Sequence, residues 1–286
     1  MNKAEATVTL PPSHQQALQR AVAYLENRDF AARLADYAGR PIARAMLLVP
    51  RAASARINKV VETAILNSLN LAIRSIGPHS KRPPAHRTAS LLAGISGGVG
   101  GFFGIAALPI ELPLTTTLML RAIADIARHH GEDLSSLEAR LACVEVFALG
   151  TPEPGKRTDI GYYASRALIS RLTADAAAIF AERSVANVSA PVVSSLATEI
   201  AMRFGIVVTE RSAASALPVL GAVGGATVNM IFMNHFQRVA RGHFAIRRLE
   251  RQYGAGLVRR LYDEHASRRN RAAHAITRGR LVADRS

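Results

Sequence analysis

The spacing of apolar residues along the chain predicts an all-α protein. Over residues 13–38 apolar positions recur every three or four residues, as in an amphipathic helix, and no stretch alternates strongly like a β-strand. A second helix is predicted over 50–76, where a Gly-Pro pair follows and stops it. Further helices are predicted over residues 114–128, 135–148, 158–182, 190–203, 217–254 and 257–266, and we expect the tail from 268 onward to be frayed.

Two helix ends carry recognisable signals. Gly131 follows the helix over 114–128 and suits a C-cap, because glycine adopts the left-handed conformation that often ends a helix. Ser135 or Ser136 is expected to cap the next helix, and Glu138 follows closely, as in a capping box.

Two stretches of 23 residues, 88–110 and 212–234, contain no charged residue. Each is long enough to cross a bilayer, which takes about 20 apolar residues. Both carry glycines four residues apart, a spacing that lets two helix backbones approach closely. A buried helical hairpin, a re-entrant insertion and two true spans all remain open from this pattern. The glycines expected at close contacts are Gly94, Gly97, Gly98, Gly101, Gly104, Gly221 and Gly225.

A basic, proline-rich segment at 81–87 is the best candidate boundary in the chain. We therefore divide the sequence into an N-terminal helical region with this linker (1–87), a helical core (88–256), and a basic C-terminal helix with its tail (257–286). The expected architecture is one multi-helix domain. Its core holds two glycine-rich apolar helices, and a long basic helix lies toward the C-terminus.

The chain of 286 residues carries 36 Lys+Arg and 21 Asp+Glu, a formal net charge of +15. The excess lies outside the middle of the chain: residues 1–87 carry +8, residues 121–211 carry −1 and residues 235–286 carry +9. Such a chain is attracted to anionic lipid or nucleic acid. The lone cysteine, Cys143, suits a reducing compartment, and the N-terminus lacks the apolar segment of a signal peptide. We expect a cytoplasmic protein, with the inner face of the cell membrane as a further location.

Ten polar residues form the candidate site. Arg121 and Asp125 are four residues apart on one helix, as are His243 and Arg247 on another, and Glu250 can reach Arg247 from three residues away. A surface ion pair and an amphipathic helix with a solvated basic face explain the same spacings without a site. The full set is Glu111, Arg121, Asp125, Glu145, Asn229, His235, Arg241, His243, Arg247 and Glu250.

Sequence motifs give little support for catalysis. The chain has no P-loop, Rossmann fingerprint or nucleophile elbow. Asp125 and His129, with His130 beside them, have ligand-like spacing, but a second ligand pair and the HExxH motif are lacking. We therefore expect neither a metal nor another cofactor.

Four segments together resemble the EcsC family of bacterial proteins. The longest is GAVGGATVNMIFMNHFQRVARGHFAIRRLERQYG at 221–254, and the others lie at 111–127, 142–150 and 159–169. The resemblance implies an all-helical fold and, because the family is named for a gene beside an ABC-type exporter, a connection with membranes. It implies no catalytic residues.

Three functions fit these observations. The first is a non-enzymatic protein that binds anionic lipid or a membrane partner, suggested by apolar runs beside arginine clusters. The second is a metal-assisted hydrolase that would bring Glu111, Asp125, Glu145, His235 and His243 into one pocket. The third is non-specific nucleic-acid binding through charge alone, which the sparse aromatic residues make the weakest of the three.

Overall fold

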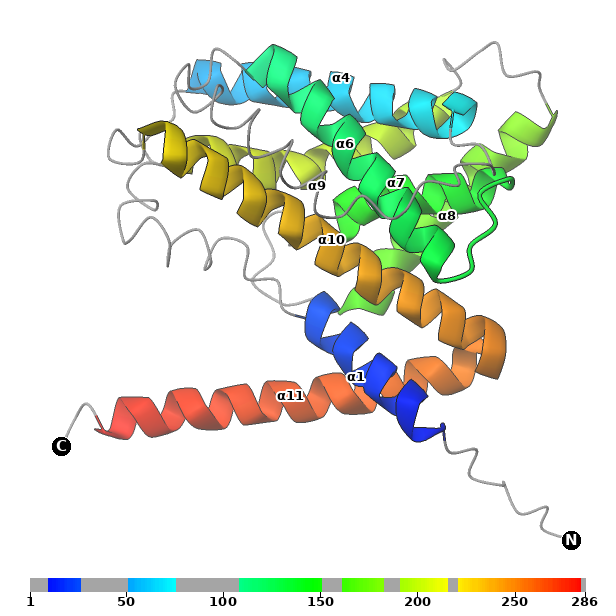
Figure 1. The fold of residues 1–286 in the computed structure, drawn as a ribbon, viewed down its shortest axis with the longest axis vertical. Helices are drawn as coiled ribbons and strands as arrows, with labels where there is room; N and C mark the ends of the chain where they lie inside the picture. Colours follow the sequence, from blue (N-terminus) through cyan, green and yellow to red (C-terminus); the bar gives the residue numbers. More distant parts are fainter. Residues whose placement is uncertain are drawn as a thin grey trace, which may run out of the picture.

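The computed structural model describes residues 10–26, 51–75, 108–150, 161–182, 191–215 and 221–283. Within these ranges the chain forms eight helices and no strand, which confirms the all-α prediction (Figure 1). The helices are α1 (Pro12–Leu25), α4 (Arg51–Ser75), α6 (Leu108–His129), α7 (Leu137–Leu149), α8 (Tyr162–Glu182), α9 (Pro191–Ser215), α10 (Gly221–Tyr253) and α11 (Ala255–Ala283).

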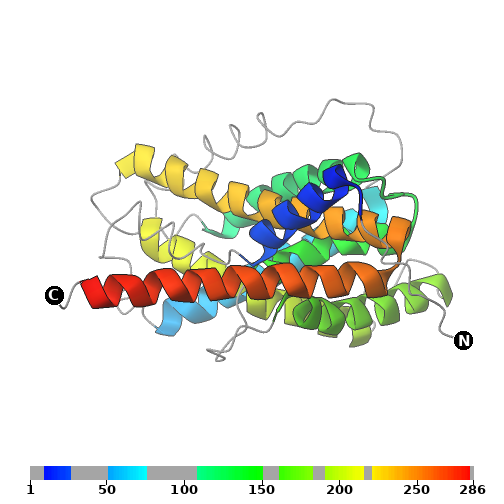
Figure 2. The ribbon, with the colours of Figure 1, turned by 90° about the horizontal axis from the view of Figure 1, so that it is seen from below.

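Helix α10 connects the two halves of the molecule. Near its start it packs against α6, α7 and α9, which also contact α4, and α8 covers α7 and α9. Farther along, α10 contacts α1 and α11, and α1 lies between them (Figure 1). Seen from below, α11 crosses under the other helices as one straight rod (Figure 2). Side chains near the C-terminal end of α10 can therefore reach both halves.

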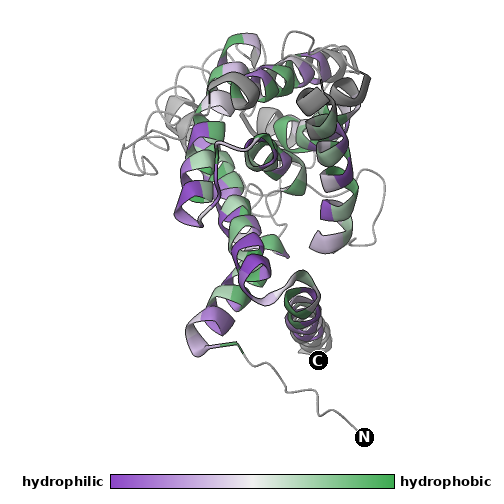
Figure 3. Ribbon diagram, turned by 90° about the vertical axis from the view of Figure 1, so that its right-hand side faces the viewer, coloured by the Kyte–Doolittle hydropathy of each residue, from purple (hydrophilic) through white to green (hydrophobic). Residues whose placement is uncertain are grey.

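Aromatic side chains from three helices fill the centre of the upper half. The ring of Phe147 on α7 lies 5.0 Å from that of Phe204 on α9 and 5.7 Å from that of Phe236 on α10, centroid to centroid. These distances suit tilted and edge-on ring contacts. All three side chains are fully buried, and Figure 3 shows the apolar positions on the inner faces of the helices. This cluster fixes α7, α9 and α10 relative to one another.

Two glycines permit close approaches that the GxxxG spacings did not predict. A Cβ on Gly242 would lie 2.7 Å from Cγ of Leu25, so α1 rests directly on the α10 backbone. A Cβ on Gly150 would lie 2.8 Å from a ring carbon of Phe236. The predicted close contacts themselves are not described: Gly94 to Gly104 lie outside the described residues, and the surroundings of Gly221 and Gly225 do too.

The caps follow the sequence prediction with one correction. Gly131 has φ +78°, the left-handed conformation expected of it. Ser136 is the N-cap of α7, and its hydroxyl accepts a hydrogen bond from the backbone N–H of Ala139. Glu138 is then the second residue of the helix and not the third, so it cannot complete a capping box.

Three helices extend beyond one of their predicted ends. Helix α9 continues to Ser215, because Val207 and Val208 are buried and the hydroxyl of Thr209 donates to the carbonyl of Gly205 within the helix. Helix α11 continues to Ala283, so the expectation of a frayed tail is wrong for 268–283. Helix α6 begins at Leu108, within the first charge-free run.

Most of the first charge-free run, 88–107, lies outside the described residues, as do the linker at 81–87 and residues 27–38. The second run is described only in part, at the end of α9 and the start of α10. No helix among the described residues combines the length and the apolar character that crossing a membrane requires.

Candidate functional site

A buried glutamate gathers two arginines where α6 turns into α7. Glu132 accepts hydrogen bonds from Nε and Nη2 of Arg247 at 3.0 and 3.1 Å, a two-pronged contact, and another from Arg251. Arg251 also donates to the backbone carbonyl of His130 at 2.8 Å. Burial opposes ionisation of Glu132, but the bonds and charges of the two arginines outweigh it and hold its pKa below the ordinary value. Glu132 therefore stays ionised.

A second ion pair joins α8 to α10 beside the first. Arg166 donates to the carboxylate of Glu250 at 2.9 Å, and the hydroxyl of Tyr163 donates to the same carboxylate at 3.0 Å. The Arg166 guanidinium also lies 5.9 Å from the ring centroids of Tyr162 and Tyr163. Only 17% of the Arg166 side chain and 11% of the Glu250 side chain are exposed, so solvent screens this pair weakly.

Neutral polar groups lie beneath these ion pairs. The hydroxyl of Tyr162 and Nδ1 of His243 are 2.9 Å apart, and Nε2 of His243 has no hydrogen-bond partner among the described residues. Burial, reinforced by the charges of Arg166 and Arg247, holds the pKa of His243 well below its ordinary value. The imidazole is therefore neutral.

Glu145 on α7 is a second buried titratable group in this region. It is 2% exposed, and burial raises its pKa even though hydroxyl groups donate to it; the hydroxyl of Ser170 lies 3.4 Å from its carboxyl oxygen. A carboxyl group in such surroundings favours its protonated form. Burial therefore disfavours a further negative charge beneath the ion pairs.

The two ion pairs border one open cleft of about 490 Å³, which we call the ion-pair cleft. It lies between the α6–α7 turn, the start of α7, α8 and α10, and it has charged side chains of both signs on its walls. Its lining is Gly131, Glu132, Asp133, Ser136, Glu138, Ala139, Arg166, Arg247, Glu250 and Arg251. Such walls can bind and orient a small polar molecule.

Of the ten predicted residues, four lie in or beneath this cleft: Glu145, His243, Arg247 and Glu250. Their partners differ from those that helical spacing suggested. Arg247 pairs with Glu132 rather than Glu250, and Glu250 pairs with Arg166.

The other six predicted residues lie elsewhere on α6 and α10. Asp125 binds Arg128 at 2.8 Å, whereas Arg121 on the same helix is exposed and Glu111 lies buried at the first turn. Asn229 is buried in the first half of α10. Nε2 of His235 donates to the carbonyl of Gly150, and Arg241 donates to Gln237 at 3.3 Å.

The described part of the chain, which includes all five residues of the hydrolase hypothesis, contains no group of three His, Cys, Asp or Glu side chains placed to hold a metal ion. Within the described ranges, Asp125 and His129 have no further ligand of the kind that a metal site on α6 would need. Cys143 is fully buried, and burial raises the pKa of its thiol far above the ordinary value.

Sequence reasoning missed Glu132, Tyr162, Tyr163, Arg166 and Arg251. A signal existed for α8, where Tyr162, Tyr163 and Arg166 fall within one helical turn of a segment that already carried the family resemblance. Glu132 directly follows the helix-ending Gly131, but its partners lie more than 100 residues away.

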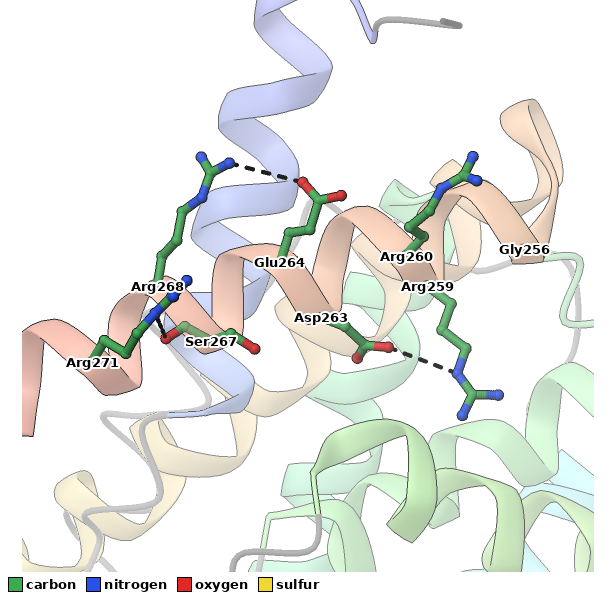
Figure 4. A pocket seen from close by; sticks show the side chains of 8 residues that line it. All are labelled: Gly256, Arg259, Arg260, Asp263, Glu264, Ser267, Arg268 and Arg271. Atoms are coloured by element: carbon green, nitrogen blue, oxygen red, sulfur yellow. Dashed lines mark hydrogen bonds and ion pairs between the residues drawn. The ribbon is translucent and has the colours of Figure 1, made fainter. Parts of the chain in front are cut away.

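A different kind of surface covers α11. Arg259, Arg260, Arg268 and Arg271 line a shallow hollow along this helix, together with Gly256, Asp263, Glu264 and Ser267 (Figure 4). The ion pairs on this surface are long, 4.0 Å for Arg259–Asp263 and 3.9 Å for Arg268–Glu264, and their side chains are at least half exposed. Exposed pairs of this kind hold their partners only weakly.

The model of the EcsC protein family matches residues 55–249 of the chain. The match includes Glu132, Glu145, Arg166, His243 and Arg247, and it ends just before Glu250. Helices α1 and α11 lie outside it. No curated protein and no solved structure matches the chain.

Proposed function

The chain belongs to the EcsC protein family, and from that premise we propose that it is a binding protein that docks on anionic membrane surfaces through α11. The observation that carries this proposal is the exposure of α11. Among its side chains up to Arg271, only Val258 and Tyr262 are buried. The helix projects along the bottom of the molecule and leaves its outer side open (Figure 1).

The charge of α11 supports a negatively charged partner. Residues 255–283 contain seven arginines and two acidic residues. A basic residue close to an anionic bilayer contributes about 1 kcal/mol of binding free energy. Several arginines on one helix therefore suffice for reversible docking without a spanning segment.

Two features favour a membrane over nucleic acid. The single aromatic residue of α11, Tyr262, is 1% exposed and packs 5.1 Å from Tyr163, ring centroid to centroid, so it cannot stack on a base. The resemblance to the family also brings an association with an exporter gene.

Vesicle sedimentation with the full chain tests the proposal. We expect the protein to sediment with vesicles of phosphatidylcholine mixed with phosphatidylserine, and to stay in solution with vesicles of phosphatidylcholine alone. High salt should release it, because it screens charges on exposed side chains. Equal sedimentation with both kinds of vesicle would overturn the proposal. Release of the protein from the vesicles by added duplex DNA, at concentrations that leave the membrane unaltered, would overturn it as well.

A matched pair of variants separates α11 from net charge. The first changes Arg260, Arg268, Arg269 and Arg271 to glutamine, and the second changes the exposed residues Arg20, Lys59, Arg121 and Arg171 to glutamine. Each removes four positive charges. At about 1 kcal/mol per residue, the α11 variant should lose roughly 1,000-fold in vesicle affinity. Equal losses in the two variants would assign binding to overall charge and reject α11 as the docking surface.

A further inference from the structure

The charges of the ion-pair cleft are sorted by depth. The positive side chains Arg166 and Arg247 are each 17% exposed, and the carboxylates that hold them, Glu132 and Glu250, are more deeply buried still. The third arginine of the lining, Arg251, is 43% exposed. Two further carboxylates lie farther out, at the rim: Glu138 is 71% exposed and lies 3.5 Å from Nη2 of Arg247, and Asp133 is exposed as well. A ligand entering the cleft therefore meets negative charge outside and guanidinium groups inside.

The inner arginines retain hydrogen-bonding capacity. Arg247 uses Nε and Nη2 for Glu132, which leaves Nη1, and Arg251 uses both terminal nitrogens for Glu132 and His130, which leaves Nε. A guanidinium group has five N–H donors in a fixed plane and binds phosphate oxygens well. Because carboxylates already hold the arginines in place, a ligand does not have to order them.

The lining is unsuited to a plain anion. Three arginines face four carboxylates, Glu132, Asp133, Glu138 and Glu250, so the formal charge of the walls is −1. A bare phosphate would be repelled by the two rim carboxylates as it entered. A molecule with an ammonium group beside its phosphate would instead contact the carboxylates at the rim and the guanidinium groups within.

From this arrangement we propose that the ion-pair cleft binds a small zwitterion in which a phosphate group carries a nearby ammonium group, as in phosphoethanolamine. Phosphate, rather than carboxylate, suits the inner end because its oxygens point in several directions, and guanidinium groups reach the cleft from both α8 and α10. The same chemistry occurs in a free phosphate monoester and in a phospholipid headgroup. The site is separate from the arginines of α11.

Calorimetric titration of the full chain at low salt provides the test, with four soluble probes: phosphoethanolamine, glycerophosphoethanolamine, inorganic phosphate and ethanolamine. We expect the zwitterion to bind at least about tenfold more tightly than inorganic phosphate or ethanolamine, a difference of about 1.4 kcal/mol. Equal binding of phosphoethanolamine and glycerophosphoethanolamine points to a lipid headgroup, and preference for phosphoethanolamine points to a free monoester. If neither of these two zwitterions binds, or if neither binds more tightly than inorganic phosphate, the proposal is overturned.

Two double variants test the rim. Asp133→Asn with Glu138→Gln should abolish the preference for phosphoethanolamine over inorganic phosphate, because the contacts with ammonium are gone. Asp263→Asn with Glu264→Gln removes the same charge from α11 and should leave the preference intact. An unchanged preference in the rim variant, or an equal loss in both, contradicts the proposed placement of the ammonium group.

Arg251→Gln tests the inner end. The side chain is 43% exposed, and Glu132 keeps its contact with Arg247, so the variant should fold. We expect it to lose about tenfold in affinity for phosphoethanolamine, with an unchanged circular dichroism spectrum; undiminished affinity would reject the inner site. The four-arginine variant of α11 should bind phosphoethanolamine normally, so failure of membrane docking and failure of this site can be told apart.

Discussion

At the scale of single residues, two buried titratable side chains, His243 and Glu145, lie beneath the ion pairs. His243 is fully buried with the hydroxyl of Tyr162 at one ring nitrogen, and Arg166 and Arg247 disfavour a proton on it. Burial likewise acts against the charged form of Glu145 nearby and raises its pKa. Buried groups of this kind make the stability of the protein depend on pH, because unfolding returns them to water.

The lowered pKa of His243 determines the direction in which this residue makes stability change with pH. The unfolded chain binds a proton at this histidine below pH 6.5, whereas the folded chain does not, so stability is lost as the pH falls below 6.5. The loss approaches about 1.4 kcal/mol per pH unit for one such group. We expect the difference in unfolding free energy between the wild type and His243→Gln to shrink by this amount per unit from about pH 6 to 5.

Urea unfolding of both proteins at several pH values measures this difference. Because Glu145 is present in both, its opposite contribution to the pH dependence cancels in the difference. His130→Gln is a useful companion, because burial, the neighbouring His129 and nearby arginines lower the pKa of His130 to about 4, in the same direction. A difference for His243→Gln that stays constant with pH would mean that the folded protein protonates His243 normally.

Individual site residues were only partly predictable. His243, Arg247 and Glu250 were found because they share one basic helical segment with a strong local pattern. Their partners were not, since Arg166 is 84 residues from Glu250 and Glu132 is 115 from Arg247. Helical spacing reports only on neighbours within one helix, so it favoured a pair between Arg247 and Glu250 that tertiary contacts replace.

At the scale of helices, the junction between α1 and α10 depends on a missing side chain. Gly242 lets Leu25 and the backbone of α1 approach α10, with a Cβ position only 3.2 Å from the carbonyl oxygen of Ala21. A hydrogen bond between His14 and the hydroxyl of Tyr253 reinforces this contact near the start of α1, and just after its end Glu26 accepts a hydrogen bond from Tyr262 of α11. Helix α1 is therefore fixed although the family match begins after it.

A double-mutant cycle tests this junction. Gly242→Ala should lower the unfolding free energy by about 1–3 kcal/mol, because the added methyl group overpacks the contact. Adding Leu25→Ala removes the crowding atom, so the double variant should be less destabilised than the sum of the two single variants, with a coupling of about 0.5–3 kcal/mol. Denaturant titration supplies all four values.

Leu18→Ala provides the matched control. Leu18 is buried on the same helix, about two turns before Leu25, and its effect should simply add to that of Gly242→Ala. If the effects of Leu25→Ala and Gly242→Ala on the unfolding free energy also simply add, Leu25 does not crowd position 242.

Helix positions could be predicted more fully than helix ends. The amphipathic patterns located α1, α4, α6, α7, α8 and α10. The ends of α9 and α11 were misjudged: the predicted helices stop at residues 203 and 266, whereas the structure continues them to Ser215 and Ala283. For α9, Val207 and Val208 beyond the predicted end are buried, so tertiary packing stabilises the additional turns.

At the scale of the whole molecule, α11 is an addition to a core that closes without it. The core helices α4, α6, α7, α9 and α10 contact one another, whereas α11 packs against α10 and α1 and, through the ring of Tyr262, against Tyr162 and Tyr163 of α8. Its removal would expose the surfaces that Val258 and Tyr262 now cover. It would also remove eight arginines and three acidic residues, together with the tail after it.

A chain that ends at Gly254 should therefore remain folded and unfold cooperatively. We expect a loss of about 3–5 kcal/mol in unfolding free energy, from the burial of one valine and one tyrosine. Circular dichroism during urea unfolding measures both quantities. A broad transition without a folded baseline would show that α11 belongs to the cooperative core.

The docking of α1 on α10 also has a consequence for biosynthesis. His14 and its partner Tyr253 are 239 positions apart, so α1 leaves the ribosome long before the end of the helix on which it packs. At about 5–20 residues per second, that interval is on the order of ten seconds or more. Throughout it, Leu18, Val22 and Leu25 have no surface to cover them. A nascent chain of this protein thus presents an apolar helix suited to early capture by a chaperone, and α1 is among the last helices to reach its final place.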